Sequence, residues 1–260
     1  MGLRRALATV CSDIIADLHV HTVLSPCAAA EMIPPLIVDE ALDRGISLIA
    51  ITDHNASSNV EAVQRAAVGT PLRVLPGMEL QTSEDVHLLC LFDTLDQVRA
   101  WQATVDACLP AVENTIEVFG EQFIVDHTGE FIMRERRLLA TAAAITLKQA
   151  VFAVTRLGGL AIPAHVDRLA TSLLANLGFV PLDVEIEALE ISRTITPEAA
   201  CARFPELRGY LLIQSGDVHH LDTFCATTVL RVAAPSIREI RLGLRGQAGR
   251  SVTIRATIQA

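Results

Sequence analysis

The sequence has little of several features that common functions require. It contains one tryptophan and one tyrosine, so an extended platform for stacking many nucleic-acid bases is not expected. It contains no apolar run of about 18 residues or more, and residues 1–11 lack the apolar stretch of a secretory signal. We therefore expect a cytoplasmic protein that neither spans nor binds a membrane.

Paired cysteines and excess positive charge are also missing. The six cysteines show no CxxC spacing, and most are expected to be buried apolar side chains in a reducing compartment. The formal net charge of −9 argues against duplex DNA as a partner, because duplex binding needs a basic face. A small phosphorylated substrate or a short single-stranded oligonucleotide fits better, since bound metals can reverse the local field.

Apolar residues, by contrast, make up 51% of the 260 residues, which is enough for a large core. Strand-like and helix-like segments alternate, and capping boxes begin helices at Thr94 and Thr146. The strand-like runs are residues 14–20, 47–52, 72–75, 86–92, 160–165, 188–192 and 210–215. About seven core strands alternating with helices suggest a βα barrel, whose ligands belong at the C-terminal ends of the strands.

The alternation breaks between residues 112 and 140. Segments 123–126 and 130–133 flank His127-Thr128-Gly129, a pattern typical of a small hairpin. We interpret 112–140 as an insertion into a single domain, 1–260. The basic run 134–137 within it predicts a solvated face, with a reach over the site as the alternative. A helix over 169–177 and an extended tail over 251–258 are also expected.

Imidazoles and carboxylates follow the apolar strands. His19 and His21 are two residues apart in an extended segment, so both face one side, and Asp17 shares that face. The same spacing pairs Asp217 with His219, and His220 points the other way. Such side chains are the ligands of hydrolytic Zn, Fe and Mn sites.

Other strands carry similar groups: His54, Glu79, His87 and His165. A carboxylate and an imidazole beside an apolar strand are costly unless paired or bound to metal, so Asp53 is expected to orient His54. Glu79 is suited to bridge two metals, because a carboxylate has two oxygens. Each residue alone has a plainer explanation as a polar strand cap, a loop acid or a hydrogen-bonded core histidine.

Together these residues resemble the PHP (polymerase and histidinol phosphatase) family of metal-dependent phosphoesterases. The motifs DLHVHT, ITDHN, PGME, HLL, PAHVDR and GDVH occur in the family's order over nearly the whole chain. The resemblance implies a distorted seven-stranded βα barrel with a small insertion, holding two or three divalent metal ions (Zn, Fe or Mn). It implies hydrolysis of a phosphomonoester, in a small metabolite, a nucleotide or an oligonucleotide end, by a hydroxide that bridges two metals.

The resemblance also implies a division of the ligands. They are His19, His21, Glu79 and Asp217 for the first metal, Glu79, His87 and His165 for the second, and His54 and His219 for the third. Cys27 stands where family members often place another ligand; a thiolate can bind Zn or Fe, and an ordinary unliganded cysteine is the alternative. The expected catalytic residues are Glu79, Asp217 and His219, with Asp217 or His219 assisting protonation of the leaving group.

Arg168 and Arg193 follow strand ends, and their guanidinium groups suit phosphate, although surface solubility explains them equally well. One alternative function is an amidohydrolase-like enzyme that cleaves C–N or C–O bonds. Such enzymes usually use a lysine as bridging ligand, but lysine is scarce here and Lys148 is predicted within a helix. The other alternative is a non-catalytic metal-binding module, which would have lost several ligands. The sequence leaves the oligomeric state open.

Overall fold

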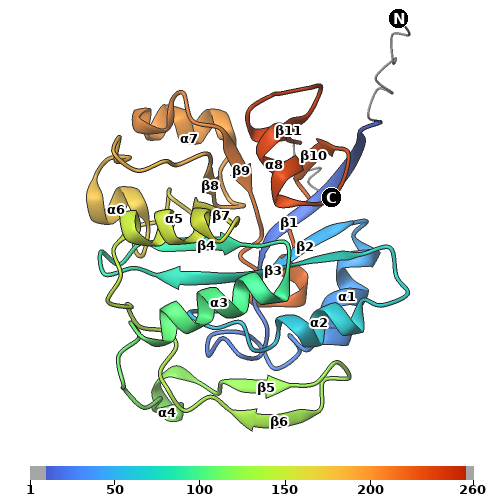
Figure 1. Ribbon diagram of the computed structural model, residues 1–260, viewed down its shortest axis with the longest axis vertical. Helices are drawn as coiled ribbons and strands as arrows, with labels where there is room; N and C mark the ends of the chain where they lie inside the picture. The colour runs from blue at the N-terminus through green and yellow to red at the C-terminus, as the bar shows by residue number, and fades with distance from the viewer. Residues whose placement is uncertain (1–9, 256–260) are drawn as a thin grey trace, which may run out of the picture.

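A computed structural model describes residues 10–255, which form a mixed α/β fold around a curled sheet (Figure 1). Within this range the sheet has seven strands in the order β11-β10-β1-β2-β3-β4-β7. Their bounds are β1 Ser12–Val20, β2 Leu48–Ile51, β3 Arg73–Gln81, β4 His87–Leu91, β7 Leu160–Pro163, β10 Thr228–Val232 and β11 Ser251–Ile254. Two further strands, β8 (Leu189–Ile191) and β9 (Leu212–Gln214), pair with each other in a separate small sheet.

The predicted βα barrel is confirmed only as a curled, mixed sheet. Strands β1, β2 and β3 are parallel, but β4 runs antiparallel to both β3 and β7. A short turn, residues 82–86, joins β3 to β4, and a connection of that length permits only an antiparallel hairpin. The expected regular alternation of strand and helix therefore fails at this point.

Strand β10 was not predicted. It pairs antiparallel with β1 on one side and with β11 on the other. Its side chains alternate between buried and more exposed, with Leu230 and Val232 buried and Arg231 exposed. This period of two was the available signal, which the apolar surroundings of the segment obscured.

Helices cover the sheet and agree with the sequence in most places. Thr94 and Thr146 form the predicted capping boxes of α3 and α5. The remaining helices of the described residues complete the fold. The bounds are α1 Pro34–Asp43, α2 Val60–Ala66, α3 Leu95–Asp106, α4 Ile116–Phe119, α5 Leu147–Arg156, α6 Leu173–Leu177, α7 Pro197–Arg203 and α8 Ile237–Leu244, with 3-10 turns η1 Pro205–Leu207 and η2 Leu221–Thr223. Helix α6 is shorter than the predicted 169–177, because Ser172 caps its first turn. The last residues of the predicted tail, 256–258, lie outside the described residues.

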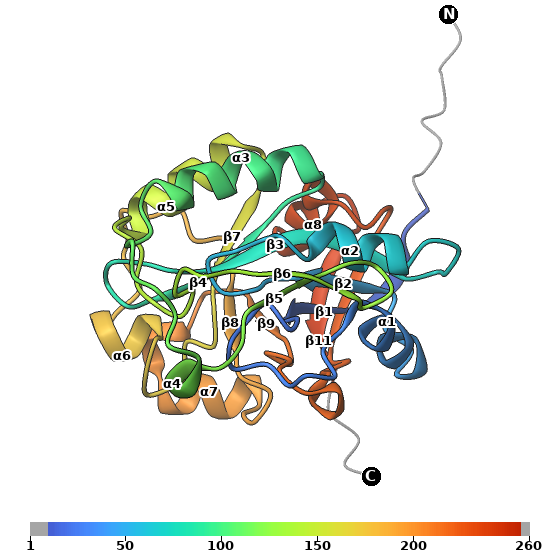
Figure 2. The same cartoon turned by 90° about the horizontal axis from the view of Figure 1, so that it is seen from below.

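The segment 112–140 contains the predicted hairpin, formed by β5 (Phe123–Val125) and β6 (Phe131–Arg134). The hairpin lies at the bottom of Figure 1 and in front of the curled sheet in Figure 2. Asn59 ties it to the rest of the fold by accepting from the amide of Val125 and donating to the carbonyl of Phe123. Whether the segment is an insertion into one domain stays a prediction.

The basic run 134–137 meets acidic side chains at the surface. Arg134 forms an ion pair with Glu121, and Arg137 forms one with Asp106. These contacts agree with the interpretation of the run as a solvated face.

The small β8–β9 sheet is joined to the main sheet by polar contacts. Thr228 in β10 accepts a hydrogen bond from the amide of Gln214 and donates one to its carbonyl, at 2.9 and 2.7 Å. At the other side, the amide of Val166, after β7, donates to the carbonyl of Glu190 in β8 at 2.9 Å. Isolated hydrogen bonds at these two seams therefore take the place of full strand pairing.

Two expectations about scarce features can be compared with the structure. Among residues 10–255, no helix is long and apolar enough to cross a bilayer. Cys90 and Cys225 are buried, but Cys27 is exposed and the other three cysteines are partly exposed. The expectation that most cysteines are buried was therefore wrong.

Gly77 offers a test of how tightly β3 packs beside β2. A Cβ atom at this position would lie 2.8 Å from the carbonyl oxygen of Ile51 and 2.9 Å from Cγ2 of Thr52. Gly77→Ala should lower the free energy of unfolding by about 1–3 kcal/mol, because backbone has to move. Denaturant titration measures it. The control Arg73→Ala, exposed on the same strand, should change it by less than about 0.5 kcal/mol. Equal midpoints for the two variants would contradict this packing.

Candidate metal centre

The predicted imidazoles and carboxylates converge at one edge of the curled sheet. His21, His54 and His165 follow the C-terminal ends of β1, β2 and β7. His87 is the first residue of β4, and because β4 is antiparallel to its neighbours, its start lies at the same edge. The antiparallel direction of β4 therefore explains why His87, at the start of its strand, lies beside histidines that follow the ends of other strands.

Glu79 is the buried centre of the cluster, with no exposed surface. Five imidazole nitrogens lie within 3.4 Å of its oxygens: His87 Nδ1 (2.8 Å), His165 Nε2 (3.1 Å) and His19 Nε2 (3.2 Å) from Oε1, and His54 Nδ1 (2.9 Å) and His21 Nε2 (3.4 Å) from Oε2. Burial alone would raise the pKa of Glu79, but the surrounding imidazoles hold it well below its usual value. The carboxylate is therefore ionised at the centre of the site.

The Nε2 atoms of His19 and His21 meet as two hydrogen-bond acceptors. His19 uses Nδ1 to donate to Glu190 Oε2 at 3.0 Å, because a carboxylate can only accept. His21 Nδ1 lies 2.8 Å from the hydroxyl of Ser25, whose one proton is donated to Asp53 at 2.7 Å, so His21 is the donor. With one proton on each ring, the two Nε2 lone pairs face each other at 3.1 Å. Burial acts to lower the pKa of His19, but the carboxylates of Glu190, Asp217 and Glu79 raise it well above its usual value, so either a metal ion or a second proton on His19 would fill this gap.

Asp217 closes this part of the site. Its Oδ1 lies 3.2 Å from Nε2 of both His19 and His21. That oxygen is buried and has no hydrogen-bond partner among the described residues. With singly protonated rings, four acceptor groups, counting Glu79, converge on one small volume, and a metal ion or an added proton has to lie between them to offset their repulsion.

The chain segment that carries Asp217 is held against β1. Val218 exchanges backbone hydrogen bonds with the residues either side of Val20, so Asp217 and His219 align with His19 and His21. Asp217 itself has φ +48°, and His165 has φ +31°. Left-handed backbone is uncommon for such residues, and strain of this kind is found at functional sites.

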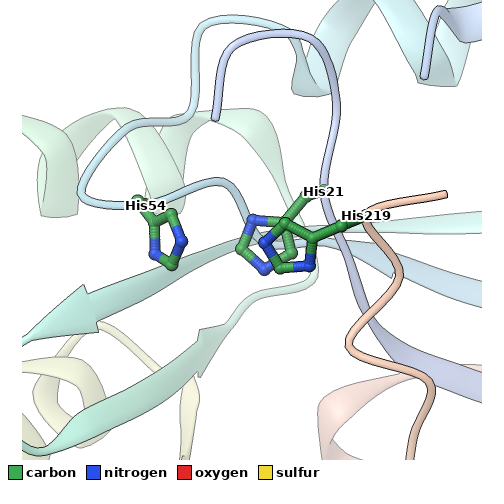
Figure 3. Close-up of side chains that lie close together, drawn as sticks. All are labelled: His21, His54 and His219. Atoms are coloured by element: carbon green, nitrogen blue, oxygen red, sulfur yellow. The ribbon is translucent and has the colours of Figure 1, made fainter. Parts of the chain in front are cut away.

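A third group of donors lies at the outer side of the cluster. Figure 3 shows the rings of His21, His54 and His219 gathered from three separate loops. Cys27 Sγ lies 3.3 Å from His54 Nε2. Although Cys27 is exposed as a residue, its sulfur lies against these rings. Desolvation of the sulfur acts to raise the pKa of the thiol, but hydrogen bonds with His219 and His54 outweigh it and lower that pKa to about 6. A thiolate beside these imidazoles is a chemically reasonable metal ligand.

The acids predicted to orient ligands have other partners. Asp53 accepts from the amide and hydroxyl of Thr22 and from Ser25, so it acts on His21 through Ser25 rather than by a hydrogen bond to His54. Asp17 accepts from the amides of His19, Gly216 and Cys225 and thereby fastens the loop before Asp217 to β1. Burial raises the pKa of Asp17 to about 7. His54, the neighbour predicted for Asp53, is thus not its hydrogen-bond partner, whereas no particular partner was predicted for Asp17.

The two arginines singled out from the sequence are in different situations. Arg168 Nη1 pairs with Asp217 Oδ2 at 2.5 Å, and its side chain is 42% exposed, so it lies at the mouth of the site. Arg193 is exposed, and its charge acts on the thiol of Cys225. His220, the alternative to His219, is exposed as well.

Sequence reasoning missed Glu190 and Ser25. Both side chains are buried, and each accepts a hydrogen bond from an imidazole of the cluster. An acidic residue inside the apolar run 188–192 was the available signal, because a buried carboxylate needs a partner. Ser25 carried no comparable signal, since serine is common in loops.

The donor atoms suit divalent metals of the Zn, Fe and Mn type, which take imidazole and carboxylate ligands. Three groups have donor atoms that all lie within 4.8 Å of one another: His19, His21, Glu79 and Asp217; His54, Glu79 and His87; and His21, His54 and His219. These groups overlap the predicted division of ligands, except that His54 takes the place of His165 beside His87. The partnerless oxygens of Glu79 and Asp217 support the fit.

Comparison with known proteins agrees with this geometry. The model of the PHP domain family matches residues 17–158. A search of curated proteins gave no match. Among solved structures, the lesion-specific endonuclease Q from Pyrococcus furiosus is 19% identical, with a TM-score of 0.65 over 93% of this chain and 58% of that one. The present chain therefore corresponds to little more than half of endonuclease Q.

Two other similar structures align with this chain over most of their own length. A candidate metal-dependent phosphoesterase from Bifidobacterium adolescentis is 17% identical, with a TM-score of 0.51 over 85% of this chain and 89% of that one. An amidohydrolase from Chromobacterium violaceum, solved with sulfate, is also 17% identical, with a TM-score of 0.57 over 95% and 100%. At these identities the similarity establishes the fold alone.

The exclusion of duplex DNA as a partner was wrong. Endonuclease Q, which shares this fold with a TM-score of 0.64, was solved with a 27-mer duplex that carries an abasic lesion at its active site. The net charge of a whole chain does not describe the field at a buried metal centre, where bound cations dominate. Acidic composition is therefore no argument against DNA for this fold.

Metal binding should stabilise the protein, because only the folded chain brings these acceptors together. Metal at about 100 times its Kd contributes about 2.7 kcal/mol, and each kcal/mol shifts Tm by about 2–4 °C in a domain of this size. Adding Mn²⁺ or Zn²⁺ to chelator-stripped protein should therefore raise Tm by about 5 °C or more in a thermal melt.

His21→Ala is the matched variant for this melt, since His21 belongs to two of the three donor groups. It should lose most of the metal-induced shift. A stripped native protein whose Tm does not respond to either metal would contradict the assignment of the centre.

Proposed function

Because the chain belongs to the PHP domain family, we propose that it is a metal-dependent phosphoesterase that hydrolyses a phosphomonoester. The observation that carries the proposal is the convergence of His19, His21, Glu79 and Asp217 on one buried point. No set of neutral hydrogen bonds satisfies this arrangement, whereas cations do. Hydrolytic metal centres in βα folds are built from such donors.

The proposed ligands follow the donor groups of the structure. Glu79 would be shared between two metals, one held with His19, His21 and Asp217 and the other with His87, His165 and His54. A third ion would lie among His21, His54 and His219, with Cys27 beside it. When bound, divalent metals supply Lewis-acid activation of water and positive charge against the oxygens of a phosphate.

The side chains of the site would assist in separate ways. Glu79 is ionised and has no exposed surface, so it would hold negative charge between the two metals. His219 is 20% exposed and its Nδ1 contacts the carbonyl of Asp217, so it lies at the edge of the cluster, where its other nitrogen would serve the third ion or, without that ion, proton donation to a leaving group. Arg168 lies at the mouth, where its guanidinium can turn from Asp217 to a bound phosphate.

The amidohydrolase alternative lacks the lysine that such enzymes usually use as a bridging ligand. Lys148 is the only lysine of the sequence, and it pairs with Asp183 at 2.7 Å on the surface, in helix α5. A lysine therefore cannot bridge two metals at this centre. The sulfate in the similar amidohydrolase structure belongs to that protein and does not alter this point.

A substrate panel tests the function. Metal-loaded protein would be assayed with p-nitrophenyl phosphate, nucleoside monophosphates, a 3′-phosphorylated oligonucleotide and a duplex with an abasic site. The last substrate is included because endonuclease Q was solved with one. Release of inorganic phosphate from a monoester supports the proposal. Cleavage of the duplex and of no other substrate refutes the proposal that the substrate is a phosphomonoester. Bound metal without turnover of any substrate favours a non-catalytic module.

Asp217→Ala should reduce kcat for the best monoester by more than about 100-fold, since even residues behind metal ligands are typically worth 10–100-fold. Circular dichroism should show a folded protein, because the loop stays fastened through Asp17 and Val218. Asp222→Ala, an acid of the following turn, is the control and should keep native turnover. Near-native kcat for Asp217→Ala in metal-replete buffer would refute its role.

Arg168→Ala should raise KM for the monoester by about 10-fold or more, because a charged hydrogen bond is worth about 1.5–3 kcal/mol. Metal content, measured by plasma mass spectrometry, should stay native, since Arg168 contributes no ligand. Arg99→Ala, which breaks a surface ion pair with Glu61, serves as the control with unchanged KM. A native KM for Arg168→Ala would show that phosphate is bound elsewhere.

A further inference from the structure

We infer that Glu190 is a positioning residue that holds two parts of the metal centre in register across the seam between β7 and β8. This inference rests on the metal centre of the proposed function. Glu190 belongs to β8, outside the main sheet, and it lies outside the segment that the family model matches, residues 17–158. No motif of the sequence drew attention to it.

One carboxylate oxygen of Glu190 joins two ligands that are far apart in the chain. Its Oε2 accepts from His19 Nδ1 at 3.0 Å and from the backbone amide of His165 at 3.0 Å. His19 belongs to the donor group with His21 and Asp217, whereas His165 contacts Glu79 Oε1 beside His87. A shift of this single oxygen would therefore disturb both metal positions.

The contact with His19 fixes its chemistry as well as its place. With Nδ1 occupied as a donor, Nε2 is left as the lone pair that faces Glu79 and Asp217. A carboxylate behind an imidazole ligand both sets this tautomer and increases the basicity of the ring. Ser25 performs the corresponding task for His21, but as a neutral hydroxyl.

The contact with His165 fixes an unusual backbone. His165 has φ +31°, and its amide and that of Val166 both donate to Glu190, one to the side chain and the other to the carbonyl at 2.9 Å. Strands β7 and β8 are not paired in one sheet, so these bonds are what joins the two edges here. Glu190 thus holds a strained residue where strand pairing is absent.

The side chain is a costly one to bury, which argues for a specific role. Glu190 is 1% exposed, and its second oxygen, Oε1, is buried without a hydrogen-bond partner among the described residues. A glutamine would satisfy the two donors with one oxygen and avoid burying a charge. The structure therefore allows acceptor position and negative charge to be separated by substitution.

Two conservative variants make this separation. Glu190→Gln keeps an acceptor at the position of Oε2 and removes the charge. Glu190→Asp keeps the charge and withdraws the oxygens by roughly 1.5 Å, one carbon–carbon bond. Titration calorimetry with Mn²⁺ on stripped protein gives the number of ions and their Kd values. Glu187→Gln, an acid of the same segment that pairs with Arg241 and Arg245 instead, is the control.

If Glu190 acts by position, Glu190→Asp should bind at least two Mn²⁺ ions about 10- to 100-fold more weakly, while Glu190→Gln stays within about 5-fold of native protein. Weak binding by Glu190→Gln together with native binding by Glu190→Asp would overturn the inference in favour of charge. Native Mn²⁺ binding by both Glu190 variants would overturn the inference outright. So would a variant that loses only one of the bound ions, because Glu190 is inferred to hold two metal positions.

Two measurements separate this result from other failures. The denaturation midpoints of the metal-free variants report any damage to the fold. A positioning role requires that Glu190→Asp loses more Mn²⁺ affinity than Glu187→Gln when the two variants have similar midpoints. A native protein that binds no Mn²⁺ refutes the proposed function itself. Native binding with unaffected variants refutes only the role of Glu190.

Discussion

Glu79 carries a carboxylate that is fully buried at the point where several strand edges of the sheet meet. A charge without exposed surface is expensive, and here imidazoles from β1, β4 and the loops after β2 and β7 surround it. With one proton on each ring they cannot all donate to it, because His19 and His21 already donate through Nδ1 to Glu190 and Ser25. The site therefore requires cations between its acceptors, and the fold has to bring the strand edges close enough to share them.

The mixed direction of the sheet meets this requirement. In a parallel pair only the residues at strand ends reach the ligand edge, and β1, β2 and β3 contribute in this way. The antiparallel strand β4 contributes its first residue, His87, instead. The sheet is interrupted in this arrangement: β8 and β9 form a separate sheet, and isolated hydrogen bonds join it to the main sheet. Irregular βα architecture and a crowded metal centre are thus two consequences of one packing problem.

The sequence predicts those features of the site that depend on residues close together in the chain. His19 and His21, or Asp217 and His219, are recognisable because a spacing of two in extended chain puts them on one face. The partners of Asp17, Asp53 and Glu190 are not recognisable in this way, because they are set by folding: Glu190 and His19 are separated by 171 positions. The same limit applies to β10, whose pairing with β1 joins the two ends of the fold. Ligands can therefore be read from local pattern, whereas the groups that orient them cannot.

The error about DNA has a physical origin in the same buried charges. The formal charge of −9 counts Asp17, Asp53, Glu79, Glu190 and Asp217 as though they faced solvent, although all five lie in or behind the centre. Two divalent ions would change −9 to −5, since −9 + 4 = −5, without altering any surface residue. A phosphate that approaches the mouth meets Arg168 and the field of the centre before it meets the average surface. For a protein of this kind, charge has to be assigned to places in the fold before it excludes any partner.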